Sequence, residues 1–263
     1  MTRPTPADFL NTPRRGPKPR ATGLTHLLDK GIPLATLQSY MPSVAGFIDI
    51  WKFGWGTAYI DPQVVEKTLE LRRHGIRTCT GGTFLEIAWQ QGRAAELFDW
   101  SAQVGFTTLE VSNGSSVMSP NDKRSLISEA SRRGFEVLAE VGSKDPLRQV
   151  PAEEWVAEML ADLDAGATLV VAEGRESGTV GLYEPDGGVR TAIIDAIEAG
   201  LDGSKVIYEA PHRDQQAWLI RNLGPQVNVG NIGLGEVMNV ESLRLGLRAD
   251  TIGIAERELR GSA

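Results

Sequence analysis

Residues 48–57, with the sequence IDIWKFGWGT, predict a buried strand that ends in a lysine and a glycine-spaced turn. A short apolar run of this kind is typical of a parallel strand covered on both faces. Gly54 and Gly56 allow a sharp turn and a close approach to a ligand, because glycine has no Cβ. We therefore expect Lys52 to lie at the rim of a sheet and to act on a ligand, with a solvated lysine as the simpler alternative.

This pattern of a short apolar run followed by polar residues or glycine occurs eight times, with helical stretches between the runs. Several joints have the order helix, glycine, apolar strand, as in Arg133-Gly134-Phe135, where glycine ends the helix in the left-handed conformation. The expected strands are 24–28, 47–50, 76–80, 106–111, 135–140, 168–172, 205–208 and 227–229.

Eight strand–helix repeats favour one closed barrel, a fold that takes about 250 residues as a single domain. The clearest expected helices are 62–74, 120–133, 151–165, 211–222 and 236–246. An open doubly wound sheet is the alternative, but the chain lacks the G-x-G-x-x-G turn after its first strand. The sequence therefore predicts an α/β protein with a single (β/α)₈ TIM barrel over residues 21–263.

The first 20 residues hold five prolines among several basic residues, a composition that cannot bury a core. They predict a flexible amino-terminal arm, residues 1–20. Such an arm can lie across a neighbouring subunit, and we expect a homo-oligomer.

Charge and composition exclude several classes of partner. A net charge of −7 provides no basic patch for nucleic acid or an anionic membrane surface. No stretch approaches the roughly 20 apolar residues of a membrane span, so we expect a cytoplasmic protein. The single cysteine, Cys79, lies in an apolar run and predicts a buried thiol, and three histidines offer no zinc cluster. Any metal here is expected to be held by oxygen.

In a barrel, the carboxyl ends of the strands meet at one mouth, where active sites are built. The charged residues expected there are Asp29, Lys30, Lys52, Glu110, Glu140, Glu173, Arg175 and Glu209. Carboxylates without histidine suit a hard divalent cation such as Mg²⁺. Together with the cations they predict an anionic substrate held on a metal, and a ring of mutual salt bridges is the structural alternative.

Two loops favour the functional interpretation. Loop 173–178, EGRESG, places the Arg175 guanidinium beside glycines, which suits a carboxylate or phosphate. Segment 228–233, NVGNIG, leads from the last strand towards a helix, where barrels often hold phosphate on backbone N–H groups. The expected substrate-binding residues are Lys30, Ser112, Arg175, Ser177, Gly178 and Asn231.

Eight motifs, in this order and spacing, resemble the phosphosulfolactate synthase family over everything beyond the arm. They are KFGWGT (52–57), GGTFLE (81–86), EVSNGSS (110–116), EVGSKDP (140–146), EGRESG (173–178), EAPHRDQQ (209–216), VNVGNI (227–232) and LRLGLRADT (243–251).

The resemblance implies a Mg²⁺-dependent lyase that adds sulfite to C3 of phosphoenolpyruvate and gives (2R)-phospho-3-sulfolactate, a step towards coenzyme M or sulfolactate. The residues it implies for catalysis are Lys52, Glu140, Lys144 and Arg213. Those available to the metal are Asp29, Glu110, Glu140, Glu173 and Glu209, with Glu140 and Glu173 the preferred pair.

This chain departs from the family pattern at three positions. Members carry EISDG, EVGKK and EAPxK, where this chain has Asn113, Ser143 and Arg213 in place of an acid and two lysines. Serine removes the charge and reach of lysine, and arginine replaces a point donor by a planar fork. Two alternatives therefore remain: a related lyase that adds another small nucleophile to an enolpyruvyl acceptor, and a non-catalytic, stress-protective relative.

Overall fold

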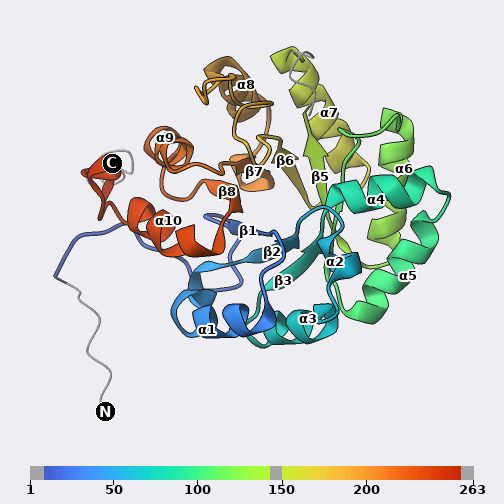
Figure 1. Ribbon diagram of the computed structural model, residues 1–263. Coiled ribbons are helices and arrows are strands. Elements are labelled where there is room, and N and C mark those ends of the chain that lie inside the picture. The colour runs from blue at the N-terminus through green and yellow to red at the C-terminus, as the bar shows by residue number, and fades with distance from the viewer. Residues whose placement is uncertain (1–8, 143–149, 256–263) are drawn as a thin grey trace.

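The structure is a computed structural model that describes residues 9–142 and 150–255. Within these residues eight parallel strands follow one another around a closed barrel, and the first strand also pairs with the eighth (Figure 1). The strands are β1 (Thr25–Asp29), β2 (Ile50–Phe53), β3 (Arg77–Thr80), β4 (Thr108–Val111), β5 (Glu136–Val141), β6 (Leu169–Ala172), β7 (Val206–Glu209) and β8 (Asn228–Ile232). The predicted (β/α)₈ TIM barrel is confirmed.

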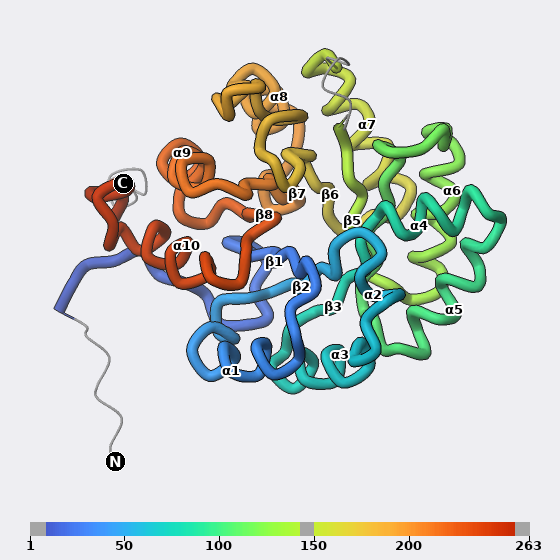
Figure 2. Tube along the Cα trace, in the orientation of Figure 1, coloured from blue at the N-terminus to red at the C-terminus, as the bar shows by residue number. Residues whose placement is uncertain are grey.

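Helices surround the strands on the outside of the barrel, as the path of the chain in Figure 2 shows. They are α1 (Leu34–Val44), α2 (Thr57–Ile60), α3 (Val64–Arg73), α4 (Gly82–Gln90), α5 (Ala94–Val104), α6 (Pro120–Arg132), α7 (Ala152–Asp164), α8 (Thr191–Gly200), α9 (Arg213–Leu223) and α10 (Val237–Arg244). None of these helices combines the length and apolar character needed to cross a membrane.

Helix α6 illustrates how the sequence sets the helix bounds. The Ser119 side chain accepts a hydrogen bond from the Asp122 N–H, and Pro120 occupies the first turn, where no backbone donor is needed. Its buried residues recur at helical spacing and face the strands. After the helix, Gly134 adopts a φ of 89°, the left-handed conformation that the sequence predicted for the joint.

Strand residues alternate between two apolar layers. Outward side chains such as Trp51 and Phe53 join the large core beneath the helices. Inward side chains, among them Ile50 and Cys79, form a smaller core inside the barrel, so the expected buried thiol is present. This alternation directs Lys52, two residues after Ile50, into the barrel above the inner core.

The second strand lies three residues later than predicted, at Ile50–Phe53, because Phe47 belongs to the short 3₁₀ helix η1 (Ala45–Phe47). Lys52 is therefore part of the strand and is only 4% exposed. A strand can continue through a buried lysine here because two carboxylates from other strands neutralise the ammonium group.

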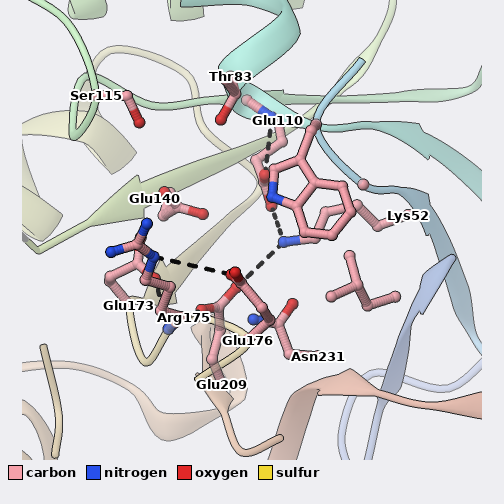
Figure 3. A pocket seen from close by; sticks show the side chains of 14 residues that line it. Lys52, Thr83, Glu110, Ser115, Glu140, Glu173, Arg175, Glu176, Glu209 and Asn231 are labelled. Carbon is pink, nitrogen blue, oxygen red and sulfur yellow. Dashed lines mark hydrogen bonds and ion pairs between the residues drawn. The ribbon is translucent and has the colours of Figure 1, made fainter. Parts of the chain in front are cut away.

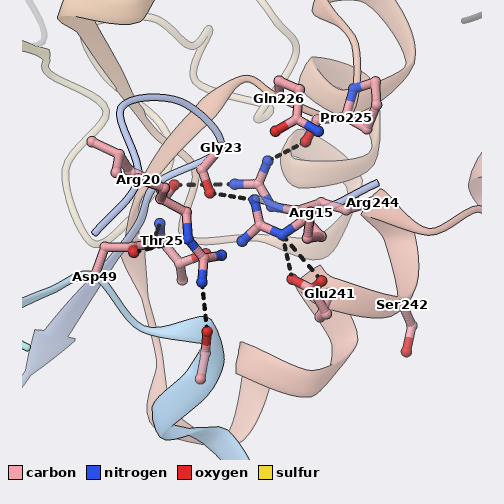
Figure 4. Close-up of polar contacts among 12 residues, drawn as sticks. Arg15, Arg20, Gly23, Thr25, Asp49, Pro225, Gln226, Glu241, Ser242 and Arg244 are labelled. Atoms are coloured by element: carbon pink, nitrogen blue, oxygen red, sulfur yellow. Dashed lines mark hydrogen bonds and ion pairs between the residues drawn. The ribbon is translucent and has the colours of Figure 1, made fainter. Parts of the chain in front are cut away.

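The described part of the arm corrects the prediction of a loose leader. Arg15 pairs with Glu241 on α10 at 3.0 Å, and Arg20 pairs with Asp49, just before β2, at 3.2 Å. Figure 4 shows these side chains gathered beside Thr25, at the amino ends of the strands. The basic residues that suggested a solvated arm instead fix residues 15–20 to the barrel.

Lys18 makes the most extensive contact in the arm. Its Nζ donates to the backbone carbonyls of Ala45, Ile48 and His74, at 3.1, 2.5 and 3.2 Å. These carbonyls lie in the connections that enter β2 and β3, so one side chain supplies donors that the loops lack.

Candidate active site

A cavity of about 220 Å³ lies at the carboxyl end of the strands. It brings together six charged residues predicted for the mouth, which come from strands β2, β4, β5 and β7 and from the loop after β6. They are Lys52, Glu110, Glu140, Glu173, Arg175 and Glu209, joined by Asn231 (Figure 3). The inner core closes the barrel below them, so the cavity opens only towards the loops.

Lys52 lines this cavity and links strands β4 and β7. Its Nζ donates to Glu110 Oε2 at 2.9 Å and to Glu209 Oε1 at 3.1 Å. Burial alone lowers the pKa of Lys52, but Glu110, Glu209 and Glu140 together outweigh it, and the pKa is raised well above its ordinary value. The lysine is a fixed positive charge at neutral pH.

Glu110 has a different electrostatic setting. Its other oxygen, Oε1, accepts a hydrogen bond from the Gly82 N–H at 2.9 Å, at the start of α4. Burial raises the pKa of Glu110 to about 7, with Lys52 opposing the shift and Glu140 and Glu209 adding to it. This carboxyl group can therefore hold or release a proton near neutral pH.

Three carboxylates form a compact buried cluster beside Lys52. One oxygen each from Glu140, Glu173 and Glu209 lies within 4.8 Å of the other two. Oxygens of one octahedral Mg²⁺ shell lie up to about 4 Å apart at metal–oxygen distances of about 2.1 Å. The three side chains would have to move closer together to hold one ion, and their all-oxygen donor set is what Mg²⁺ prefers. The residues fit the expected cation.

Backbone amides of the β6–α8 loop orient this cluster. Glu209 Oε2 accepts from the N–H groups of Gly174 and Arg175, both at 3.0 Å, and Glu173 Oε1 accepts from the Arg175 N–H at 2.6 Å. Arg175 has a φ of 58°, a conformation rare for residues other than glycine. The strained turn points its amide inward while its guanidinium lies at the cavity rim (Figure 3).

The structure does not bring Asp29 into the cavity, which corrects its assignment as a metal ligand. Leu28 lines the cavity, so the next side chain along β1 faces the helical layer. There Asp29 Oδ2 accepts from Trp51 Nε1 at 3.0 Å and lies 3.3 Å from Lys67 Nζ on α3. Its carboxylate is a structural anchor.

Other predicted substrate or catalytic residues also lie away from the cavity. Lys30 is exposed, and Arg213 is exposed and pairs with its neighbour Asp214 at 2.7 Å. Ser177 and Gly178 contact the start of α9 instead, where their carbonyl oxygens accept hydrogen bonds from His212 Nε2 and Gln215 Nε2. Lys144 and Ser143 lie outside the described residues.

Ser112 is fully buried, and its hydroxyl donates to Glu86 rather than facing the cavity. The residues that sequence reasoning missed include Trp55, Thr83, Ser115 and Glu176, all of which line the cavity. Glycine-rich turns directly after β2 and β3 precede two of them, and that signal was visible in the sequence.

Comparison with known proteins identifies the family. A model of the (2R)-phospho-3-sulfolactate synthase (ComA) family matches residues 13–250. The chain belongs to this family. It is 40% identical over 251 residues to the phosphosulfolactate synthase of Methanothermobacter thermautotrophicus, covering 94% of this chain and 97% of that relative. The phosphosulfolactate synthase of Bacillus subtilis is 38% identical over 248 residues, with 93% and 98% covered.

Solved structures outside the phosphosulfolactate synthase family share the fold alone. The 3-hexulose-6-phosphate synthase of Salmonella typhimurium superposes with a TM-score of 0.53 at 15% identity, over 89% of this chain and 95% of that one. The carboxyl transferase domain of Rhizobium etli pyruvate carboxylase superposes with a TM-score of 0.56 at 11% identity, over 87% of this chain and 44% of that one.

Proposed function

We propose that this member of the family is a lyase that adds sulfite to C3 of phosphoenolpyruvate, with Mg²⁺, and yields (2R)-phospho-3-sulfolactate. The observation that carries the proposal is the buried ion pair of Lys52 with Glu110 and Glu209, beside the Glu140–Glu173–Glu209 cluster in one cavity. Family membership and the names of the relatives support the same reaction.

The reaction needs one bond and one proton. The sulfite lone pair forms a carbon–sulfur bond at C3, and the electrons of the C2=C3 double bond move to C2 and the adjacent carboxylate. A proton then adds to C2, so that sulfite, phosphoenolpyruvate and one proton balance the product. The enzyme must therefore stabilise growing negative charge next to a carboxylate and supply a proton.

The residues of the cavity supply these requirements. Lys52 provides a fixed positive charge that its buried setting keeps in place. Glu110 can deliver a proton near neutral pH. Arg175, at the rim, offers a planar fork to the phosphate or carboxylate of an entering substrate.

Glu140, Glu173 and Glu209 would hold Mg²⁺, which when bound would neutralise charge on the substrate carboxylate and on the carbanion that forms beside it. The three carboxylates otherwise repel an anionic substrate. Their closeness is thus easier to reconcile with a cation than with direct substrate binding.

The altered lysine positions bear on the nucleophile. The family resemblance implies a catalytic role for Arg213, but its exposed guanidinium pairs with Asp214 away from the cavity. Among the described residues, Lys52 and Arg175 are the cations that line the cavity, and we propose that they bind the negative charge of sulfite. A different small nucleophile on the same acceptor is the alternative that these substitutions favour.

The test uses purified protein with phosphoenolpyruvate, Mg²⁺ and sulfite, and detects phosphosulfolactate by mass spectrometry. We expect turnover that requires all three components. Phosphoenolpyruvate at 100 times its Kd, with Mg²⁺, should also stabilise the fold by about 2.7 kcal/mol, which a melting curve detects. Binding of phosphoenolpyruvate without turnover of sulfite would point to another nucleophile. The absence of both binding and turnover would overturn the proposal.

A further inference from the structure

Glu86 is a buried carboxylate that the proposed reaction does not use. It lies on the cavity-proximal half of α4 and is 2% exposed. The Ser112 hydroxyl donates to its Oε1 at 2.5 Å, and the Ser115 N–H donates to its Oε2 at 2.9 Å. One side chain therefore fastens both ends of a four-residue segment that follows β4.

The segment that Glu86 holds forms part of the cavity wall. Ser115 lines the cavity, and so do Gly82 and Thr83 at the start of α4. In Figure 3 the hydroxyls of Thr83 and Ser115 lie on the same side of the cavity, opposite Glu209 and Asn231. Glu86 thus joins two neighbouring parts of that wall, the start of α4 and the loop after β4.

The contact between these two parts leaves no room for adjustment. A Cβ on Gly82 would lie 2.3 Å from Ser112 Oγ and 2.9 Å from Ser112 Cβ, so only glycine allows this approach. The Gly82 N–H in turn binds Glu110. The Glu86 bracket, defined as Glu86 with Ser112 and Ser115, is therefore linked through Gly82 to Glu110, the residue proposed to supply the proton.

We propose that Glu86 is a positioning residue for substrate: it holds the Ser115 hydroxyl, beside that of Thr83, where both can donate to an anionic oxygen of phosphoenolpyruvate. This rests on the proposed function. Hydroxyl donors suit phosphate or carboxylate oxygens, and a loop anchored at two points presents them with little loss of entropy on binding.

The chemistry of the bracket predicts which substitutions preserve it. Glutamine keeps one oxygen to accept from the Ser115 N–H, and its amide can donate to Ser112, because a hydroxyl both donates and accepts. Alanine loses both hydrogen bonds. Glu86→Gln should therefore behave like wild type, and Glu86→Ala should release the loop without touching a residue that lines the cavity.

The experiment compares Glu86→Ala and Glu86→Gln by hydrogen exchange of peptides covering 112–118 and by steady-state kinetics with phosphoenolpyruvate. In Glu86→Ala we expect exchange at Ser115 to accelerate at least about tenfold and the KM for phosphoenolpyruvate to rise about tenfold, with kcat changed much less. Glu86→Gln should remain within about threefold of wild type in all three measurements.

Glu241→Ala is the matched control, because Glu241 is also a buried glutamate but lies at the amino end of the barrel. It should lose stability and leave KM and loop exchange unchanged. Unchanged exchange in Glu86→Ala, or faster exchange with an unchanged KM, would overturn the positioning role. An equal rise of KM in Glu241→Ala would show that the effect of Glu86→Ala on KM comes from general destabilisation, and this too would overturn the positioning role of Glu86.

If Glu86→Ala does not fold, Ser115→Ala takes its place, with Ser116→Ala as its control, since Ser116 does not line this cavity. A raised KM for Ser115→Ala alone supports the inference, and equal KM values for the two variants and wild type contradict it. Failure of the proposed function looks different. Wild type itself would then show neither a melting shift nor turnover with phosphoenolpyruvate.

Discussion

At the scale of single residues, the alternation of side chains along a strand decides which charges reach the cavity. Ile50 and Lys52 point inward while Trp51 between them points outward, and Leu28 faces the cavity while Asp29 does not. The sequence identified both charged residues as rim candidates. It did not separate them, because the register of each strand was uncertain by a few residues.

Substitution of Lys52 by Met should affect both stability and activity. It removes the ammonium from a site where Glu110 and Glu209 remain buried, and breaking one partner of a buried pair costs about 3–5 kcal/mol. We expect a loss in this range in urea unfolding at pH 8, and turnover reduced by at least about a hundredfold. A variant as active as wild type would exclude Lys52 from the reaction.

Glu110 should leave a signature in the pH dependence of stability. Its pKa is about 7 when folded, against an ordinary value of 4.5, so the folded state binds its proton more tightly. The contribution of Glu110 to the free energy of unfolding is therefore favourable at low pH and declines as pH rises from about 4.5 to about 7.

The Glu110→Gln variant lacks this titration. Relative to wild type, its free energy of unfolding should increase by roughly 1 kcal/mol per pH unit within that window and level off above it. Urea unfolding between pH 4.5 and 8.5, with a chelator present, measures the difference. A difference that stays constant with pH would show that Glu110 does not titrate there.

At the scale of secondary-structure elements, local patterns predicted the eight strands and their glycine joints well, because each signal lies within a few residues. Local patterns did not predict the structure of the amino-terminal arm. Its prolines and basic residues indicate disorder in isolation, yet Arg15, Lys18 and Arg20 contact helix α10 and loops that are far away in sequence. Only the closed barrel places those carbonyls and carboxylates within reach.

The arm should contribute to stability without contributing to catalysis. Lys18→Ala leaves three loop carbonyls without their donor, and we expect a loss of about 2 kcal/mol in the free energy of unfolding. Arg14→Ala, at an exposed position of the same arm, should cost less than about 0.5 kcal/mol. Because both positions lie at the end of the barrel opposite the cavity, kcat and KM should be unchanged in both. If Lys18→Ala and Arg14→Ala are equally stable, the contacts of Lys18 do not fix the arm to the barrel.

At the scale of the whole molecule, closure of the barrel joins residues that are far apart in the chain, such as Lys52 and Glu209, which are 157 positions apart. The sequence predicted that carboxylates would converge at one mouth, since that follows from the fold alone. The fold alone did not predict which three carboxylates would form the compact cluster. That depends on the β6–α8 loop, whose Gly174 and Arg175 amides orient Glu209 and whose strained turn has no pattern in the sequence.

The cluster leads to the last prediction, which concerns the metal. Because Glu140, Glu173 and Glu209 lie within 4.8 Å of one another in a protein of net charge −7, Mg²⁺ should raise the melting temperature of wild type and be required for phosphoenolpyruvate to raise it further. Replacing both Glu140 and Glu173 by Gln removes two charged ligands, and we expect both shifts to disappear.

Glu176→Gln is the control for this pair of substitutions, since Glu176 lines the same cavity but lies outside the cluster. It should keep the Mg²⁺ shift. Each variant is compared with its own melting temperature in chelator, so a general loss of stability does not imitate a loss of binding. Isothermal titration with Mg²⁺ gives the same answer independently of melting. If the double variant binds Mg²⁺ as wild type does, the metal lies elsewhere, and the cluster must be explained by interactions within the protein, such as those of Glu209 with Lys52 and the loop amides.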